Sequence, residues 1–203
     1  MRTLHSELPV MEQFYSVQGE GFHSGRPAFF IRLAGCEVGC SWCDVKESWT
    51  VTENQIRKIS EMVAQTVDSG TNFAVITGGE PCMYDLVELT SQLQKSGIEV
   101  ALETSGAYPV SGQFDWICLS PKKFRLPLAE NFALADELKV IVVNRDDLEW
   151  CVEMASKTRP DCRWYLQPEW DRREKVLPLI VDYVKRNTRW SISLQTHKYI
   201  NVP

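Results

Sequence analysis

Short runs of apolar, β-branched residues alternate along this chain with longer segments of helical periodicity. Each run is long enough for one pass across a sheet, and the longer segments repeat apolar residues three and four positions apart. Such alternation is typical of a parallel sheet whose strands are joined by crossover helices. The expected strands are residues 28–33, 73–77, 99–103, 116–119, 138–143, 164–166 and 191–194.

Four helices are expected between or after these strands. The clearest covers residues 53–68, because Thr52 and Gln55 have the spacing of an N-terminal capping box. The apolar residues that follow share one helical face, namely Ile56, Ile59, Met62, Val63 and Val67. The other expected helices are 85–96, 145–157 and 172–187, and residues 120–132 are expected to be irregular.

The length of the chain limits how these elements can close. A complete eight-stranded α/β barrel takes roughly 250 residues, whereas this chain has 203. No linker rich in glycine, serine or proline divides it, so we expect a single domain over 1–203. The predicted fold is α/β, a partial, TIM-like barrel of six to seven mostly parallel strands with few crossover helices.

Composition narrows the class of function. A net charge of −5 gives no basic surface for a phosphate backbone, which favours a small-molecule substrate and no nucleic acid partner. The N-terminal residues do not join a basic segment to an apolar run, and no stretch of about 18 apolar residues occurs. We therefore expect a cytoplasmic protein with no membrane association. In that compartment the seven cysteines should be free thiols.

Polar motifs follow the expected strands at the point where each strand ends. Ligands of such sheets bind at the carboxyl ends of the strands, so these motifs should converge on one mouth. They are Gly35 with a cysteine-rich loop, TGGEP at 77–81, ETSG at 103–106, SPK at 120–122, Asn144, QPE at 167–169 and QTHK at 195–198.

Cys36, Cys40 and Cys43 stand in the spacing C-x3-C-x2-C directly after the first expected strand. Three thiolates can hold three irons of a 4Fe-4S cluster and leave the fourth iron open to a ligand. A different interpretation is a non-catalytic zinc site, completed by His23 or Asp44. The remaining cysteines lie in or beside apolar stretches and are expected to be buried without chemistry; they are Cys82, Cys118, Cys151 and Cys162.

The cysteine loop, the aromatic Trp42 before its third cysteine and the GGEP motif after the second expected strand together resemble the radical S-adenosylmethionine (SAM) superfamily. The resemblance implies that the amino and carboxylate groups of SAM chelate the open iron. The backbone at 78–80 would then pair with the amino group, to which Glu80 could also offer its carboxylate, and Trp42 would pack near the adenine.

Both ends of the chain point to one family within that superfamily. FYSVQGEG at 14–21 with GRPA at 25–28, and SLQTHKYI at 193–200, resemble the N- and C-terminal signatures of the 7-carboxy-7-deazaguanine synthases. This resemblance implies ring contraction of 6-carboxy-5,6,7,8-tetrahydropterin with loss of ammonia, in the biosynthesis of queuosine and other deazapurines. It also implies a homodimer that receives electrons from flavodoxin or ferredoxin.

The same resemblance assigns binding roles but no residue that acts directly in the chemistry. The cluster ligands would be Cys36, Cys40 and Cys43. The substrate would be held by Val17, Gln18, Gly19, Glu20, Arg32, Thr77, His197 and the terminal carboxylate of Pro203. SAM would be held by Trp42, Gly78, Gly79, Glu80, Ser120, Pro121, Lys122, Gln167 and Pro168.

The sequence departs from the family at Val45. Family members commonly carry a hydroxyl residue two positions after the last cluster cysteine, where it helps to bind a magnesium ion that also contacts the substrate carboxylate. Valine has no oxygen to offer, and magnesium requires oxygen ligands. Either water and substrate complete the magnesium shell, or the ion is absent and a cation such as Lys46 takes its place.

A second radical SAM activity fits the cysteine spacing alone. Enzymes that install a glycyl radical in a partner protein are also short and carry C-x3-C-x2-C. That interpretation leaves the QGEG segment at 18–21 and the QTHKYI segment at 195–200 without a role.

Overall fold

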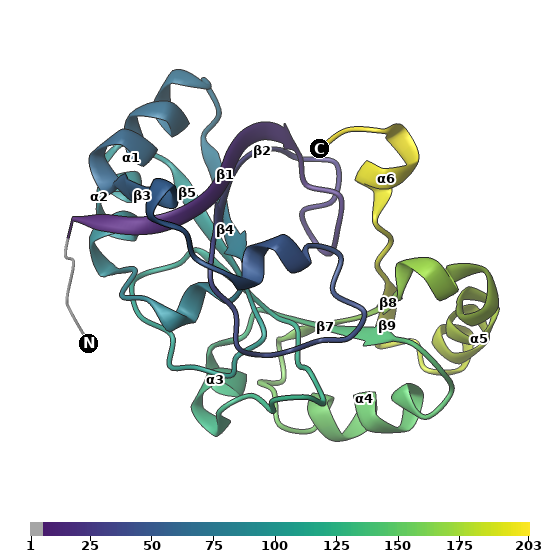
Figure 1. The fold of residues 1–203 in the computed structure, drawn as a ribbon. Helices are drawn as coiled ribbons and strands as arrows, with labels where there is room; N and C mark the ends of the chain where they lie inside the picture. The colour runs from purple at the N-terminus through teal and green to yellow at the C-terminus, as the bar shows by residue number, and fades with distance from the viewer. Residues whose placement is uncertain (1–5) are drawn as a thin grey trace.

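A nine-stranded sheet carries the fold, in the order β3-β1-β2-β4-β5-β6-β7-β8-β9 (Figure 1). The structure is a computed structural model and describes residues 6–203. Seven neighbouring strands run parallel, and β1 runs antiparallel to both β2 and β3. The strands are β1 (Glu7–Val17), β2 (Pro27–Leu33), β3 (Ile56–Lys58), β4 (Phe73–Gly78), β5 (Glu99–Thr104), β6 (Trp116–Leu119), β7 (Glu137–Val142), β8 (Arg163–Pro168) and β9 (Trp190–Ile192).

The sheet does not close on itself, because β3 and β9 are its two edges. Each of the seven expected strands is present within two residues of its predicted ends, and these seven form the parallel part. The prediction of an open, partial α/β barrel is therefore confirmed. The antiparallel strands β1 and β3 were not predicted from the sequence.

Six α-helices and four short 3₁₀ helices accompany the described strands. No helix within residues 6–203 is long and apolar enough to cross a membrane. The α-helices are α1 (Ile59–Asp68), α2 (Val87–Lys95), α3 (Ala129–Leu134), α4 (Asp147–Ala155), α5 (Arg173–Arg186) and α6 (Thr196–Ile200). The 3₁₀ helices are η1 (Lys46–Trp49), η2 (Glu53–Gln55), η3 (Pro81–Met83) and η4 (Trp170–Arg172).

The predicted helix over 53–68 is wrong in its first part. The backbone N–H of Thr52 does donate to the Gln55 side chain at 2.9 Å, but this box precedes only the single turn of η2. Ile56 then begins β3 and pairs with Pro9 of β1, so the helix starts at Ile59. Strand pairing with β1 thus overrides the local helical signal. Val67 is exposed, and Thr66 lies on the buried helical face instead.

Two other expectations about helices need correction. Residues 120–132 are not irregular throughout, because α3 begins at Ala129. The C-terminal segment, for which the sequence predicted only a strand, continues after β9 into α6.

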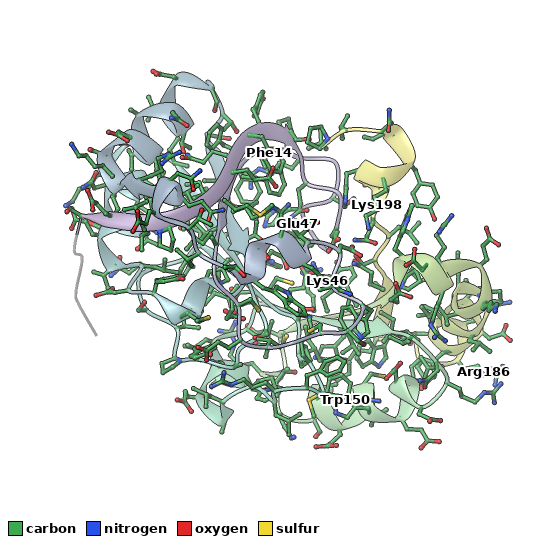
Figure 2. The ribbon with its side chains drawn as sticks, in the orientation of Figure 1. Phe14, Lys46, Glu47, Trp150, Arg186 and Lys198 are labelled. Carbon is green, nitrogen blue, oxygen red and sulfur yellow. The ribbon has the colours of Figure 1, made fainter. Side chains whose placement is uncertain are left out.

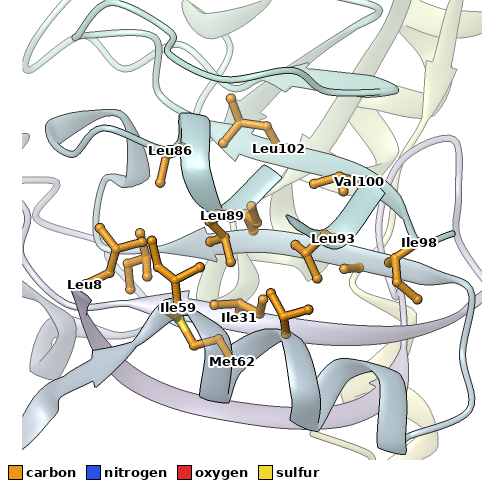
Figure 3. Close-up of a cluster of buried hydrophobic side chains, with 14 of the residues drawn as sticks. Leu8, Ile31, Ile59, Met62, Leu86, Leu89, Leu93, Ile98, Val100 and Leu102 are labelled. Carbon is orange, nitrogen blue, oxygen red and sulfur yellow. The ribbon is translucent and has the colours of Figure 1, made fainter. Parts of the chain in front are cut away.

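Apolar side chains on one side of the sheet pack under the helices. Around β2, β4 and β5 they form a cluster with α1 and α2, in which Ile31, Met62, Leu89 and Leu93 are fully buried (Figure 3). A second cluster lies under α4 and α5 and includes Cys151 and Cys162. The expectation that the four isolated cysteines are buried is confirmed.

The opposite, concave side of the sheet becomes polar toward the carboxyl ends of the strands. Side chains alternate along a strand, so in β2 the buried Ile31 and Leu33 face the helices while Arg32 faces the other way. The same alternation in β4, β5 and β7 places Thr77, Glu103 and Lys139 beside a cavity on this concave side. The hydrophobic pattern therefore positions the site by excluding these polar residues from the core.

Candidate active site

The three cysteines of the C-x3-C-x2-C loop line one cavity of about 240 Å³ at the carboxyl end of the sheet. Main-chain hydrogen bonds connect the start of the loop to η1, which follows it: Gly35 N donates to Ser48 O at 2.6 Å and Cys36 N donates to Trp49 O at 3.2 Å. Cys40 is buried and the other two thiols are half-buried. The loop thus holds three thiols at the inner surface of a pocket with room for a further ligand.

The surroundings of these thiols fit a 4Fe-4S cluster. Val38 packs beside them together with Ala107 and Tyr108, which lowers the local dielectric, and the backbone N–H of Val38 donates to Cys36 Sγ at 3.5 Å. Burial raises the pKa of Cys36 and raises that of Cys40 to about 11, so a cationic metal centre is needed to hold these groups as thiolates.

The zinc interpretation is wrong for His23 and unsupported for Asp44. The ring of His23 packs 4.8 Å from Phe73 and 5.0 Å from Trp116, the first residues of the parallel strands β4 and β6. The cysteine loop follows the C-terminal end of the parallel strand β2, so it lies at the opposite end of the strands. Within residues 6–203, no three His, Cys, Asp or Glu side chains converge on one ion. The three cysteines of a 4Fe-4S cluster bind three separate irons, so their thiols need not converge on one ion.

The glycines of the GGEP motif are required by close backbone contacts. A Cβ atom at Gly78 would lie 2.2 Å from Leu33 O, and one at Gly79 would lie 2.2 Å from Gly35 O. Gly78 also has a φ of 139°, in the region that side chains disfavour. The motif therefore packs directly against the start of the cysteine loop, and its main chain borders the cavity.

Glu80 is fully buried and its carboxylate is saturated by the protein. Oε1 accepts from Cys82 N at 3.0 Å and from the Thr104 hydroxyl at 2.6 Å, while Oε2 accepts from Ser105 N at 2.8 Å and from the Ser105 hydroxyl. Four acceptor positions are the capacity of a carboxylate. The sequence-based expectation that this side chain receives the ammonium of SAM is thus not supported, and the side chain braces β4 against β5.

The other residues predicted to hold SAM divide into two groups. Trp42, Ser120, Lys122 and Gln167 line the cavity. The ammonium of Lys122 donates to the carbonyl and hydroxyl of Ser120, both at 2.6 Å, and lies 5.5 Å from the centre of the Trp42 ring. The remaining two, Pro121 and Pro168, are buried and do not line it.

A second cavity of about 130 Å³ adjoins the first and contains most of the residues predicted to hold the substrate. The two cavities share Glu20, Thr77 and Glu103. The second cavity is also lined by the predicted residues Val17, Gln18, Gly19, His197 and Pro203 and by the unpredicted Phe14, Phe30 and Val75. Glu20, Thr77 and Glu103 form a wall that borders both cavities. A molecule in the second cavity would therefore lie next to one in the first.

This second cavity exists because two distant segments of the chain pack together (Figure 1). Gly19 O accepts from both the N–H and the hydroxyl of Thr196 at 2.9 Å, and Gly21 N donates to the Ser193 hydroxyl at 2.9 Å. Near the end of the chain, the Ser16 hydroxyl donates to Pro203 O at 2.9 Å. The QGEG and QTHKYI segments thus form one structural unit, which spans the open side of the sheet.

Lys139 lines the first cavity, contacts two residues of the shared wall and was missed from the sequence. Its ammonium is 2.6 Å from Glu20 Oε2 and 2.9 Å from Glu103 Oε2, and its side chain is only 3% exposed. Burial alone would raise the pKa of Glu20. The charge of Lys139 and the hydrogen bonds from Lys139, Gln195 and Gln167 instead lower this pKa to about 2. The one signal in the sequence was a lysine inside the apolar strand ELKVIV.

Arg32 lies at the outer mouth rather than in the second cavity. Its Nε donates to Glu12 Oε1 at 2.6 Å, and it borders a depression that also contains Asp44, Val45, Lys46 and Lys198. The guanidinium therefore stands beside the cysteine loop, where it could receive an anionic group entering the site.

Comparison with known proteins agrees with this arrangement. Residues 30–116 match the family model described as the radical SAM superfamily. The 7-carboxy-7-deazaguanine synthases of Flavobacterium psychrophilum and Synechocystis are each 48% identical to the chain; the matches cover 97% and 96% of this chain and 93% of each relative. The crystal structure of QueE from Escherichia coli superposes with a TM-score of 0.85 at 32% identity, over 94% of this chain and 95% of that one.

The chain belongs to the 7-carboxy-7-deazaguanine synthase family. As a radical SAM protein of this family it uses a 4Fe-4S cluster and SAM, for which the cysteine loop and the first cavity are suited. Membership also explains why the two end segments meet, which the glycyl-radical interpretation does not. The 7-carboxy-7-deazaguanine synthase family is thus the identity indicated both by the motifs and by the fold.

Proposed function

We propose that this protein is a 7-carboxy-7-deazaguanine synthase that converts 6-carboxy-5,6,7,8-tetrahydropterin to 7-carboxy-7-deazaguanine with loss of ammonia. The observation that carries the proposal is the common wall of Glu20, Thr77 and Glu103 between the two cavities. The first cavity would hold the cluster and SAM and the second the pterin, so the reacting groups would meet at this wall. Such placement of reactants is a major part of enzymatic rate enhancement.

When bound, the cluster and SAM would supply a 5′-deoxyadenosyl radical that takes a hydrogen atom from C6 of the pterin and returns one after ring contraction, and loss of ammonia then gives the product. The carboxylates of Glu20 and Glu103 would accept hydrogen bonds from N–H groups of the pterin ring. Both form ion pairs with Lys139. Their role is to orient the substrate, and neither acts as a nucleophile.

The family's substrate-binding residues are assigned to matching positions here. Val17, Gln18 and Gly19 would contact the ring with Thr77, and the carboxylate of Pro203 would reach it from the other side. His197 packs so closely on Gly19 that a Cβ there would lie 2.0 Å from its Nδ1. Burial lowers the pKa of His197, so we propose that the neutral imidazole faces the substrate at pH 7.

SAM would lie along the first cavity. Trp42 would pack near its adenine and the main chain at Gly78 and Gly79 would pair with its amino group. Ser120, Pro121, Lys122, Gln167 and Pro168 would complete this part of the site, the two prolines by shaping the loops from behind. Cys36, Cys40 and Cys43 would ligate the cluster.

The proposal extends to the partners of the enzyme. We propose a cytoplasmic homodimer that takes its electron from flavodoxin or ferredoxin. Mixing the reduced form of either donor with the oxidised enzyme, and following the loss of cluster absorbance, measures this step directly.

The function is tested by reconstituting the protein anaerobically with iron and sulfide and adding SAM, a reductant and the pterin. The expected result is 7-carboxy-7-deazaguanine, identified by mass spectrometry against an authentic standard. Cys43→Ser serves as the matched control, because it removes one cluster ligand. Failure to form the product with an intact cluster would contradict the proposal.

A further inference from the structure

The mouth of the site, defined here as Arg32, Asp44, Val45, Lys46, Gln195 and Lys198, differs in its oxygen donors from a magnesium site. Val45 takes the place of the hydroxyl residue that the family commonly uses for magnesium. Its side chain has no oxygen, and its main-chain carbonyl accepts from Ser48 N at 3.1 Å and from the Ser48 hydroxyl at 2.6 Å. Residue 45 therefore offers a metal ion nothing from its side chain, and its carbonyl is already bonded.

One oxygen of the neighbouring carboxylate is also committed. Oδ2 of Asp44 accepts from Lys198 Nζ at 2.7 Å and from Gln195 Nε2 at 2.9 Å. A divalent ion on this carboxylate would stand close to the ammonium of Lys198 and be repelled by it. Asp171 borders the mouth from η4, a different element from the cysteine loop. With no side-chain oxygen at residue 45 and one Asp44 oxygen held by Lys198, the loop lacks the oxygen donors that near-octahedral magnesium ligation requires.

Positive charge is available at the mouth instead. Arg32 uses only Nε for its bond to Glu12, so both Nη groups remain without a protein partner among the described contacts. Lys46 is the first residue of η1 and is labelled in Figure 2. It is exposed, lines the same depression as Arg32 and has no carboxylate within 4 Å in the described part of the chain. A guanidinium fork and a free ammonium together match the two oxygens of a carboxylate.

We infer that this protein binds the carboxylate of its substrate without a magnesium ion, through the guanidinium of Arg32 and the ammonium of Lys46. This inference rests on the proposed function, because it takes 6-carboxy-tetrahydropterin as the ligand. It makes Lys46 a binding residue and makes the Asp44–Lys198 pair the feature that disfavours the ion.

The first test measures binding of the pterin to the reconstituted protein after passage through a chelating resin, with and without millimolar magnesium. The expected dissociation constant changes less than two-fold. A tightening of ten-fold or more on addition of magnesium would overturn the inference while leaving the proposed function in place. Failure to bind the pterin at every magnesium concentration would overturn both.

The second test requires no turnover and uses Mn²⁺, with the pterin present, as a paramagnetic probe of the magnesium site. Electron paramagnetic resonance of the wild-type protein should show only free Mn²⁺, as should Val45→Ala. Val45→Thr restores a hydroxyl and, with the pterin present, should immobilise Mn²⁺ and tighten pterin binding on addition of magnesium. Tight, stoichiometric Mn²⁺ binding by the wild-type protein at this mouth would overturn the inference.

The role of Lys46 is tested by Lys46→Met, which removes the charge and keeps the length of the side chain. Loss of one charge-assisted contact should weaken pterin binding about ten-fold. SAM binding should be unchanged. Lys58→Met, on the exposed β3, is the matched control and should bind the pterin normally. Equal affinity of Lys46→Met and Lys58→Met would contradict the assignment.

Discussion

Lys139 Nζ lies 2.6 Å from Oε2 of Glu20, joining the middle of β7 to the loop between β1 and β2. Glu103 of β5 approaches the same ammonium at 2.9 Å. The acidic groups around the ammonium, Cys118, Glu103 and Glu20 among them, raise the pKa of Lys139 well above its usual value although burial alone would lower it. One buried cation therefore fixes two carboxylates in the wall that the cavities share.

Replacing Lys139 by methionine should remove the ion pairs that hold Glu20 and Glu103 in this wall. Two partly buried carboxylates would lose the one ammonium that pairs with them in the described residues, and breaking such a pair costs about 3 kcal/mol of folding stability. We expect a lower midpoint of thermal unfolding and weaker pterin binding, with SAM binding little changed.

Glu20→Gln in the same chain provides the control for Lys139→Met. The double variant should recover part of the lost stability, because it removes one uncompensated charge. Additive losses in the double variant would show that the two side chains are not coupled.

Glu80→Gln should destabilise the protein although it changes few atoms. The amide nitrogen that replaces one carboxylate oxygen cannot accept hydrogen bonds, so at least one buried donor of Cys82, Thr104 or Ser105 loses its acceptor. We expect a loss of about 2 kcal/mol in the free energy of unfolding, measured by urea denaturation. Glu61→Gln, on the exposed face of α1, should change this value by less than about 0.5 kcal/mol. Equal effects of the two substitutions would argue against the bracing role of Glu80.

Gly19→Ala should weaken pterin binding by displacing the imidazole of His197. The new methyl group would overlap that ring, and α6 would have to move outward. Pterin affinity, measured by equilibrium binding, should fall about ten-fold or more, a displacement penalty of the size that overpacking produces. In the double variant Gly19→Ala/His197→Ala the overlap is absent, so thermal stability should recover while pterin binding stays weak. An unchanged affinity in Gly19→Ala would contradict the placement of His197.

His197 should make the protein less stable in mild acid. Burial lowers its pKa below the ordinary value of 6.5, so the folded state favours the neutral ring. The stability from this group is fully present above pH 6.5 and is lost as the pH falls through the folded pKa, because the unfolded chain binds the proton more readily. The free energy of unfolding, measured against pH, should fall below pH 6.5.

His197→Asn should reduce the slope of that pH dependence without abolishing it, because burial also lowers the pKa of His23. Glu20, whose pKa is lowered from 4.5 to about 2 in the folded state, adds its own loss of stability only as the pH falls toward 4.5 and below, where the unfolded chain binds a proton at this residue. A slope unaffected by the substitution would place the acid sensitivity elsewhere.

The parallel strands were predictable because each is a buried, apolar run, such as FAVITG in β4. Strand β1 was not, because it is long, mixes Glu12 and Gln13 with apolar residues and is only partly buried. Strand β3 was hidden inside a helical pattern, and only its pairing with β1 determines its conformation. Tertiary pairing of this kind leaves no local signal.

The parts of the candidate site that consist of motifs following strands were predictable from the sequence. The roles of individual side chains were not, where their hydrogen-bond and ion-pair partners determine those roles. The cysteine loop and the QGEG and QTHKYI segments could be found from spacing and resemblance. Sequence could not show that Glu80 is saturated by its neighbours or that Lys139 is paired with two carboxylates. Whether a charged group serves the fold or the ligand depends on which atoms surround it.

The most direct measurement of the central claim uses pterin deuterated at C6 with the reconstituted protein, SAM and reductant. We expect deuterium to appear in 5′-deoxyadenosine and 7-carboxy-7-deazaguanine to accumulate. Formation of 5′-deoxyadenosine without deuterium, and without any deazaguanine product, would contradict that claim.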